Sequence, residues 1–374
     1  MKLKISKVFF LKITVIVIVS MVLTSCSLLQ NTDVKNDVSA FDTERNIPSG
    51  LGKYFVTFIS TKVKSINSEE TILNIFDLEN NKSFLTEPIE KGNLEANKNY
   101  RYGEVFLAED INLMILDVQD GNYQVIVNDG KVIRKIGQIK ASANIGVYKN
   151  KLICTAYNFN NETAQAFIRS YDISGNECAL EKEISINGNP SDLKIDDNGN
   201  VYVVSYDFKQ SKTYLYHFSL DDYLYSEEAF LDYPASCKIS FMQGAVIIGC
   251  YEKVSDDTKV SKQPINKVYI KKDGKPLSEL YNFKEFNVYD IMAVNNILYI
   301  VDSPNRPQYL LFDIDKKKVL KKDSIGFDNY YGMKSINNKV YFFSEKEIRL
   351  FEKNINKIIY QDNSMSGTIS LKIR

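Results

Sequence analysis

The chain has 374 residues, with 47 basic and 47 acidic side chains, one histidine and no tryptophan. A balanced charge creates no basic field, so we expect no nucleic-acid partner. One histidine excludes a zinc site built on several histidines. That residue, His217, lies in the aromatic run TYLYHF, and the chain has no G-x-S-x-G motif for a serine hydrolase. The sequence therefore predicts no catalytic residue, metal ligand or cofactor.

The first 25 residues have the layout of a secretory signal. Four lysines within residues 2–12 precede an apolar run at residues 13–23. This run is shorter than the roughly 20 residues of a membrane-spanning helix, although an uncleaved anchor is the alternative. The run ends in Leu23-Thr24-Ser25-Cys26, which resembles the lipobox of bacterial lipoproteins. The resemblance implies cleavage before Cys26, a diacylglyceryl group on its thiol, and a lipid-anchored protein on the extracytoplasmic face of the cell membrane.

Residues 26–50 are predicted to form a lipidated N-terminus and a flexible tether, because they are polar and end in Pro48-Ser49-Gly50. A short leader strand at residues 38–41 is the alternative. Removal of the signal takes away four lysines and no acid, so the mature chain has four more acidic than basic residues. The folded domain is predicted to span residues 51–374.

From residue 51 the chain is a succession of short β-rich runs separated by turn pairs such as Asp120-Gly121 and Asn198-Gly199. The pattern recurs about every 42–52 residues, with four runs in each copy, as in the blades of a β-propeller. We predict an all-β chain with a single propeller. Its seven four-stranded blades open near residues 53, 102, 145, 192, 238, 290 and 332, and six blades is the alternative. Residues 368–373 are expected to close the ring against the first blade.

One blade, residues 189–207, resembles those of NHL and gluconolactonase-like propellers. The matching residues are Pro190, Leu193, Ile195, Asp196, Gly199, Asn200, Tyr202, Val203 and Asp207. The resemblance covers one blade and implies the fold. Gluconolactonase-like enzymes hold a divalent metal with Glu, Asn and Asp, a set that has no match here. Residues 196–200 (DDNGN) have calcium-like composition but lack the sixth-position Gly and distal Glu of an EF-hand, so we predict a turn.

Loops on a rigid scaffold are the usual carriers of function. In a propeller, the loops after the second and the fourth strand of each blade share one face. Here that face is rich in Tyr, Asn and Asp, which suits a peptide, a protein surface or a glycan. Turn formation and packing between blades are the competing roles for any single residue. The predicted ligand-binding residues are Tyr157, Asn158, Tyr206, Asp207, Tyr251, Glu252, Asp302 and Tyr331.

Cys237 and Cys250 flank the turn Gln243-Gly244 symmetrically, so a two-residue turn would place them opposite each other across a hairpin. We consider two roles for this pair: a cross-strand disulfide, or two buried thiols that act as small apolar residues.

Taken together, the patterns predict a lipid-anchored binding or scaffolding protein of the cell envelope. Its partners would be the membrane, through Cys26, and an envelope protein, peptide or glycan on the loop face. A propeller hydrolase or lyase acting on sugars or lactones is one alternative. A solute-binding accessory lipoprotein of a transporter is another.

Overall fold

The computed structural model describes residues 45–46, 49–52, 54–65, 68–88, 103–107, 112–119, 122–128, 131–140, 144–160, 163–175, 177–255, 263–272, 274–344, 347–352, 355–361 and 372–373. The chain divides into two compact units, Met1–Val38 and Ser39–Arg374. The predicted signal, Cys26 and most of the tether lie outside the described residues. The described part of the chain contains no helix with the length and apolarity that a membrane crossing requires.

The strands of unit Ser39–Arg374 form seven sheets. Five of them have four strands each: β9 (Ile145–Tyr148), β10 (Lys151–Asn160), β11 (Thr163–Asp172) and β12 (Ala179–Ile186); β13 (Asn189–Ile195), β14 (Asn200–Asp207), β15 (Lys212–Ser219) and β16 (Tyr225–Leu231); β17 (Ala235–Met242), β18 (Ala245–Lys253), β19 (Gln263–Lys272) and β20 (Ser278–Asn282); β21 (Asp290–Val294), β22 (Ile297–Val301), β23 (Gln308–Asp313) and β24 (Lys318–Ser324); β25 (Gly332–Ile336), β26 (Lys339–Phe343), β27 (Glu347–Glu352) and β28 (Ile355–Gln361).

The other two sheets contain the N-terminal strands. One has three strands, β2 (Phe55–Ser65), β3 (Ser68–Asp77) and β4 (Lys82–Pro88). The other has six, because the blade strands β5 (Gly103–Leu107), β6 (Asn112–Gln119), β7 (Asn122–Asn128) and β8 (Val132–Lys140) are joined at one edge by β1 (Arg45–Asn46) and at the other by β29 (Lys372–Ile373). Strand β1 falls within the segment that the sequence predicts to be a tether.

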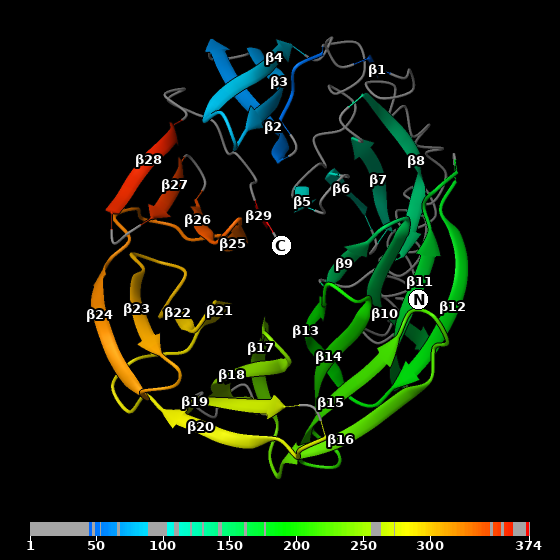
Figure 1. The fold of residues 1–374 in the computed structure, drawn as a ribbon. Coiled ribbons are helices and arrows are strands. Elements are labelled where there is room, and N and C mark those ends of the chain that lie inside the picture. The colour runs from blue at the N-terminus through cyan, green and yellow to red at the C-terminus, as the bar shows by residue number, and fades with distance from the viewer. Residues whose placement is uncertain are drawn as a thin grey trace, which may run out of the picture. The chain divides into compact units, whose positions relative to one another are not determined.

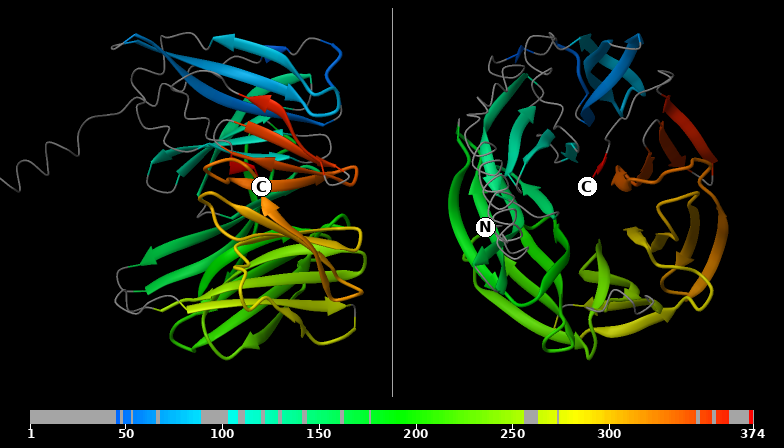
Figure 2. Two further views of the ribbon diagram at one scale, coloured as in Figure 1. Left: turned by 90° about the vertical axis from the view of Figure 1, so that its left-hand side faces the viewer. Right: turned by 180° about the vertical axis from the view of Figure 1, so that it is seen from behind.

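The seven sheets surround a common axis, with β5, β9, β13, β17, β21 and β25 innermost (Figure 1). The view from behind shows the same circular order (Figure 2). This arrangement confirms the predicted propeller and the seven-blade count. The strands that open the blades begin within a few residues of the predicted positions, at residues 55, 103, 145, 189, 235, 290 and 332.

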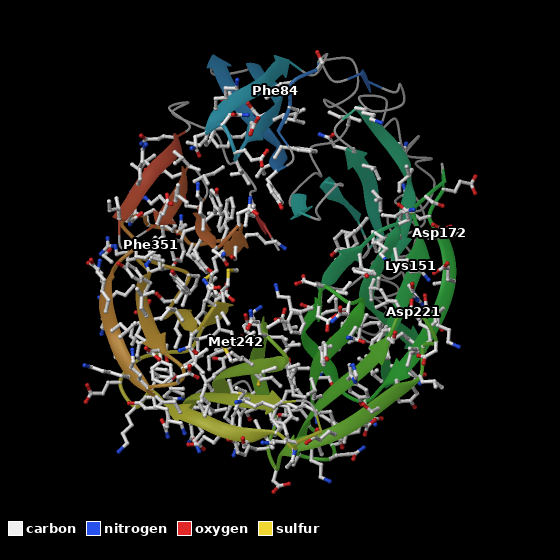
Figure 3. The ribbon with its side chains drawn as sticks, in the orientation of Figure 1. Phe84, Lys151, Asp172, Asp221, Met242 and Phe351 are labelled. Atoms are coloured by element: carbon white, nitrogen blue, oxygen red, sulfur yellow. The ribbon has the colours of Figure 1, made fainter. Side chains whose placement is uncertain are left out.

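Six apolar clusters lie between neighbouring sheets around the ring. Blade strands bury side chains on both faces, which explains why apolar runs such as VYVVSY are continuous and do not alternate with polar residues. Phe351 of β27, for example, packs in the cluster between the last two sheets (Figure 3). The side chains of Tyr216, Tyr309 and Phe342 are almost completely buried in the same way.

Polar side chains connect successive innermost strands of four sheets. Asn144 Nδ2 donates to the carbonyl of Pro190 at 3.3 Å, at the step from β9 to β13. The carboxylate of Asp192 on β13 accepts the N–H of Ile239 on β17 at 2.8 Å. Ser240 on β17 accepts the N–H of Ala293 on β21, also at 2.8 Å. Directional bonds of this kind set the rotation of one blade relative to the next.

The ring closes differently from our expectation. Strand β29 pairs in parallel with β5 of the second blade, through Lys372↔Glu104 and Ile373↔Val105, and not with the first blade. The first and last sheets share no strand within the described residues. They meet through an apolar cluster, in which the rings of Phe76 and Tyr360 are 5.1 Å apart. The closing contact is therefore mainly side-chain packing.

The calcium-like segment is a turn, as predicted. Asp196 Oδ1 accepts the N–H groups of Asn198 and Asn200 at 2.9 and 2.8 Å, and its Oδ2 accepts Asn200 Nδ2. Gly199 has a φ of +81°. A Cβ on Gly199 would also lie 2.7 Å from the ring of Tyr148 in the preceding blade, so this turn requires glycine for two reasons.

The predicted hairpin register of Cys237 and Cys250 is confirmed, because they are direct partners between β17 and β18. Both are buried free thiols, so the structure has the pair in its reduced form. Burial and the neighbouring Cys250 raise the pKa of the Cys237 thiol well above its usual value.

Candidate functional site on the loop face

Three of the predicted tyrosines occupy equivalent places in successive blades. Tyr157, Tyr206 and Tyr251 lie near the ends of β10, β14 and β18, the second strand of each blade. All three side chains are half-buried. They belong to the face on which second strands run into third strands, which we call the loop face.

Close packing of the backbone against the end of β14 fixes the position of Tyr206. The loop at Asn187 and Gly188 enters the blade directly against the end of β14, and Ser205 Oγ donates to the carbonyl of Asn187 at 2.6 Å. Gly188 has a φ of +74°, and a Cβ there would lie only 2.3 Å from the carbonyl oxygen of Tyr206. The loop can approach this closely only because residue 188 is glycine.

Burial raises the pKa of two of these phenols, Tyr157 and Tyr251. It raises the pKa of Tyr157 to about 12, and the nearby Tyr206 contributes in the same direction. It also raises the pKa of Tyr251 to about 12, and Glu252 and Tyr289 add to the effect. A neutral phenol can donate and accept hydrogen bonds while its ring offers apolar area, so the surface suits contacts with uncharged polar groups.

The structure adds a fourth tyrosine that we did not single out, Tyr289. Its ring is 5.6 Å from that of Tyr251, in an edge-to-face arrangement. Its backbone N–H donates to the carbonyl of Val301. The sequence could have indicated this residue, because it lies in the loop before the sixth blade and neighbouring loops on the same face also contain tyrosine.

The loop that leaves β22 and the loop that enters β25 are joined to each other on this face. Arg306 N–H donates to the carbonyl of Asp328 and Tyr330 N–H to that of Pro304, both at 2.7 Å. Tyr330 OH donates to Asp290 Oδ2 at 2.6 Å. Tyr331, a predicted ligand residue, follows directly and is half-buried. We call Tyr157, Tyr206, Tyr251, Tyr289 and Tyr331 the tyrosine arc.

The predicted acidic residues have structural roles in the free protein. Asp207 Oδ1 accepts the N–H groups of Lys209 and Gln210, so it caps the turn after β14. Asp302 Oδ1 accepts the N–H of Gln308 at 2.8 Å and closes the loop at residues 303–307. Glu252 is half-buried beside Tyr251. The side chain of Asn158 lies outside the described residues.

His217 lies away from the loop face. It is in the middle of β15, and its ring stacks on that of Tyr202 with centroids 4.5 Å apart. Among the residues that the structure describes, no group of three or more His, Cys, Asp or Glu side chains could hold a metal ion. The chemistry of the loop face, within these residues, is thus that of neutral phenols and engaged carboxylates.

Comparison with known proteins supports the fold. No protein-family model matches the sequence, and no curated protein is similar to it in sequence. Solved structures do match. The β-propeller domain of the Trilobed protease from Pyrococcus furiosus, described as having an open velcro topology, is 14% identical, with a TM-score of 0.56 over 87% of this chain and 97% of that one.

Acylaminoacyl peptidase from Pyrococcus horikoshii is 12% identical, with a TM-score of 0.55 over 88% of this chain. A complex of acylaminoacyl peptidase with a chloromethyl ketone gives the same TM-score at 13% identity. This chain spans 54% of the length of each of these peptidases. At this level of identity the likeness establishes a β-propeller and nothing about activity.

Proposed function

We propose that this chain is a lipid-anchored, extracytoplasmic binding protein of the cell envelope, whose propeller binds a protein partner with its loop face. The observation that carries the binding role is the tyrosine arc, which gathers five half-buried tyrosines from successive blades on one face. Tyrosine provides rigid contact area at a small entropic cost, which is why it is common in binding surfaces. The lipobox-like Leu23-Thr24-Ser25-Cys26 supports the anchoring part of the proposal.

The test is chemical crosslinking in intact membranes, followed by purification of the full-length protein. We expect one envelope protein to be recovered in near-equal amount, and the Cys26→Ala variant to lose it together with membrane attachment. Changing Tyr157, Tyr206 and Tyr251 to Ala should abolish capture. A matched triple change of the exposed outer residues Leu224, Tyr225 and Leu320 to Ala should leave capture intact.

Two results would count against the proposal. Capture that survives the triple tyrosine change would remove the loop face from the interaction. Recovery of wall glycan in place of a protein would change the partner class and favour the alternative of a sugar-binding or sugar-cleaving propeller, which stays a prediction.

A further inference from the structure

Two cysteines lie directly opposite each other in the sheet β17–β20. Cys237 on β17 and Cys250 on β18 are register partners, and neither side chain is exposed to solvent. Both belong to the apolar cluster between this sheet and the preceding one. The thiol of Cys237 donates to the carbonyl of Ala235 at 3.7 Å.

Hydrogen bonds to the preceding blade show which kind of strand pair the cysteines form. The N–H of Cys237 donates to Ser191 Oγ at 3.4 Å. Two residues later, the N–H of Ile239 donates to Asp192 Oδ2 at 2.8 Å. Both acceptors lie on β13, so the N–H groups of these alternate residues point away from β18. Cys237 and Cys250 are therefore a non-hydrogen-bonded pair of the antiparallel ladder.

A pair of this kind has the spacing that a disulfide requires. Its Cα atoms are typically about 4.5 Å apart, and its side chains are closer than those of a hydrogen-bonded pair. A disulfide spans Cα separations of about 4.4–6.8 Å, so the bond can form here without a large movement of the strands. The two thiols also affect each other, because Cys250 adds to burial in raising the pKa of the Cys237 thiol.

We propose that Cys237 and Cys250 are a redox-active pair, which a disulfide-bearing oxidant converts to a cross-strand disulfide. A thiolate of the pair attacks the oxidant and releases one of its thiols, and the second cysteine then attacks the mixed disulfide and releases the other. Two protein thiols are oxidised to one S–S bond, and the oxidant's disulfide is reduced to two thiols that take up the two protons. The inference rests on the proposed function in one respect, because oxidants of this class act outside the cytoplasm.

Burial determines when this exchange takes place. An oxidant does not reach buried thiols, and a thiol with a raised pKa forms little of the thiolate that attacks a disulfide. The bond therefore has to form while the chain folds. The finished ring then protects it from reductants.

The pair lies beside the loop face. The register of β17 and β18 shifts directly after the cysteines, where Ser236 lies opposite Glu252. Tyr251 of the tyrosine arc is thus the extra residue of a β-bulge. A covalent bond between the cysteines holds the strand in place on one side of this bulge. Oxidation should therefore make the backbone at Tyr251 less mobile.

The test refolds the full-length protein from urea in detergent, with oxidised and reduced glutathione as the redox probe, and blocks free thiols with iodoacetamide. Trypsin separates the two cysteines, because Lys238 lies between them. We expect mass spectrometry to find the two peptides joined, and reduction to release them. The oxidised form should melt about 3 °C or more above the form refolded in dithiothreitol, since the bond constrains the unfolded chain.

Matched variants identify the bond. Cys237→Ala and Cys250→Ala should each lose the joined peptides and the difference in melting temperature. Changing Cys154 and Cys178 together to Ala should leave both, because Cys154 has Arg169 as its register partner on β11. Hydrogen exchange should slow at least threefold at Tyr251 in the oxidised form and stay unchanged in β26.

Alkylation of both Cys237 and Cys250 after refolding with oxidised glutathione would overturn the proposal and leave them as small apolar residues. Equal amounts of links to Cys154 or Cys178 would do the same. Unchanged exchange at Tyr251 would remove the effect on the loop face. Alkylation in intact cells tests the location separately. A bond that forms in the refolding buffer but is absent in cells would count against the extracytoplasmic placement and not against the pair.

Discussion

Two regions of the ring are held together in different ways. From β9 to β21, side chains on or directly before one innermost strand bond to the backbone of the next, through Asn144, Asp192 and Ser240. Between β25–β28 and β2–β4, closure depends mainly on an apolar cluster that includes Phe76 and Tyr341, beside one long hydrogen bond of 3.5 Å from Tyr54 OH to Asn337 Oδ1. Hydrogen bonds fix an orientation, whereas apolar contacts tolerate small rotations.

This difference matters for the candidate site. Most of the tyrosine arc is built on β10, β14, β18 and the loop before β21, which belong to the hydrogen-bonded region. We infer that this region acts as a rigid platform for the loop face. The sheets β25–β28 and β2–β4, which we call the closing region, chiefly complete the ring.

The largest expected effect is in the closing region. Phe76→Ala removes a side chain that is 2% exposed and packs on Tyr360, so it should destabilise the protein by about 3–5 kcal/mol. Urea unfolding measures the loss, with Phe76→Leu as the milder control. Hydrogen exchange should accelerate in β2–β4 and β25–β28 more than in β13–β18. Equal acceleration in all blades would show that the two regions do not differ.

The next effect is in the hydrogen-bonded region. Asp192→Ala leaves the buried N–H of Ile239 without its acceptor and leaves Lys238 without its nearest carboxylate. We expect a loss of about 2–4 kcal/mol in the free energy of unfolding. Asp192→Asn keeps an acceptor for the N–H and should lose less than half as much. If the two variants were equally unstable, the bond to Ile239 would not be the important contact.

A smaller effect, of opposite sign, is expected at the centre of the ring. Folding lowers the pKa of Lys334 from 10.5 to about 8, so its protonated form is less favourable in the folded state. Lys334→Met should therefore stabilise the protein at pH 7 by about 1–3 kcal/mol. As the pH rises from about 8 to 10.5, the folded state loses this proton before the unfolded state does.

The free energy of unfolding of the wild type should therefore rise through that pH range, relative to the variant. Urea titrations of both proteins at pH 7, 9 and 10.5 check this. A variant that is less stable than the wild type at pH 7 would mean that Lys334 serves the fold, and a difference that does not shrink with pH would contradict the assigned titration.

The smallest effect concerns Ser240, whose hydroxyl accepts the N–H of Ala293. Ser240→Ala should cost about 1 kcal/mol in urea unfolding, the usual net value of one hydrogen bond. Ser185→Ala on the exposed face of β12 is the control: its hydroxyl accepts Gln165 Nε2 at 2.7 Å within the same sheet, in contact with solvent, so its loss should cost less than about 0.5 kcal/mol. Similar values for both would remove Ser240 from the set of bonds that connect the blades.

Periodicity and turn chemistry were enough to predict the propeller, its blade count and the pairing of Cys237 with Cys250. The closure could not be predicted in this way, because two residues of β29 carry no register information and either of two inner edges could accept them. The shared position of Tyr157, Tyr206 and Tyr251 followed from their equal spacing after the turns.

No local sequence pattern shows which residues of different blades are in contact. The hydrogen bond from the N–H of Ile239 to Asp192, for example, joins residues 47 positions apart in the sequence. Asp207 and Asp302 looked like ligand residues because strand-end carboxylates suit both turns and ligands. Only their bonds to backbone N–H groups distinguish the two roles.

The central claim is that the loop face meets the partner. A photoreactive phenylalanine derivative placed at Tyr206 on the loop face, or at the 55% exposed Tyr225 on the outer strand β16, tests it in intact cells. We expect ultraviolet light to give one defined crosslinked product from position 206 and none from position 225. Crosslinking from position 225 with none from position 206 would place the interaction on the outer rim and contradict the account.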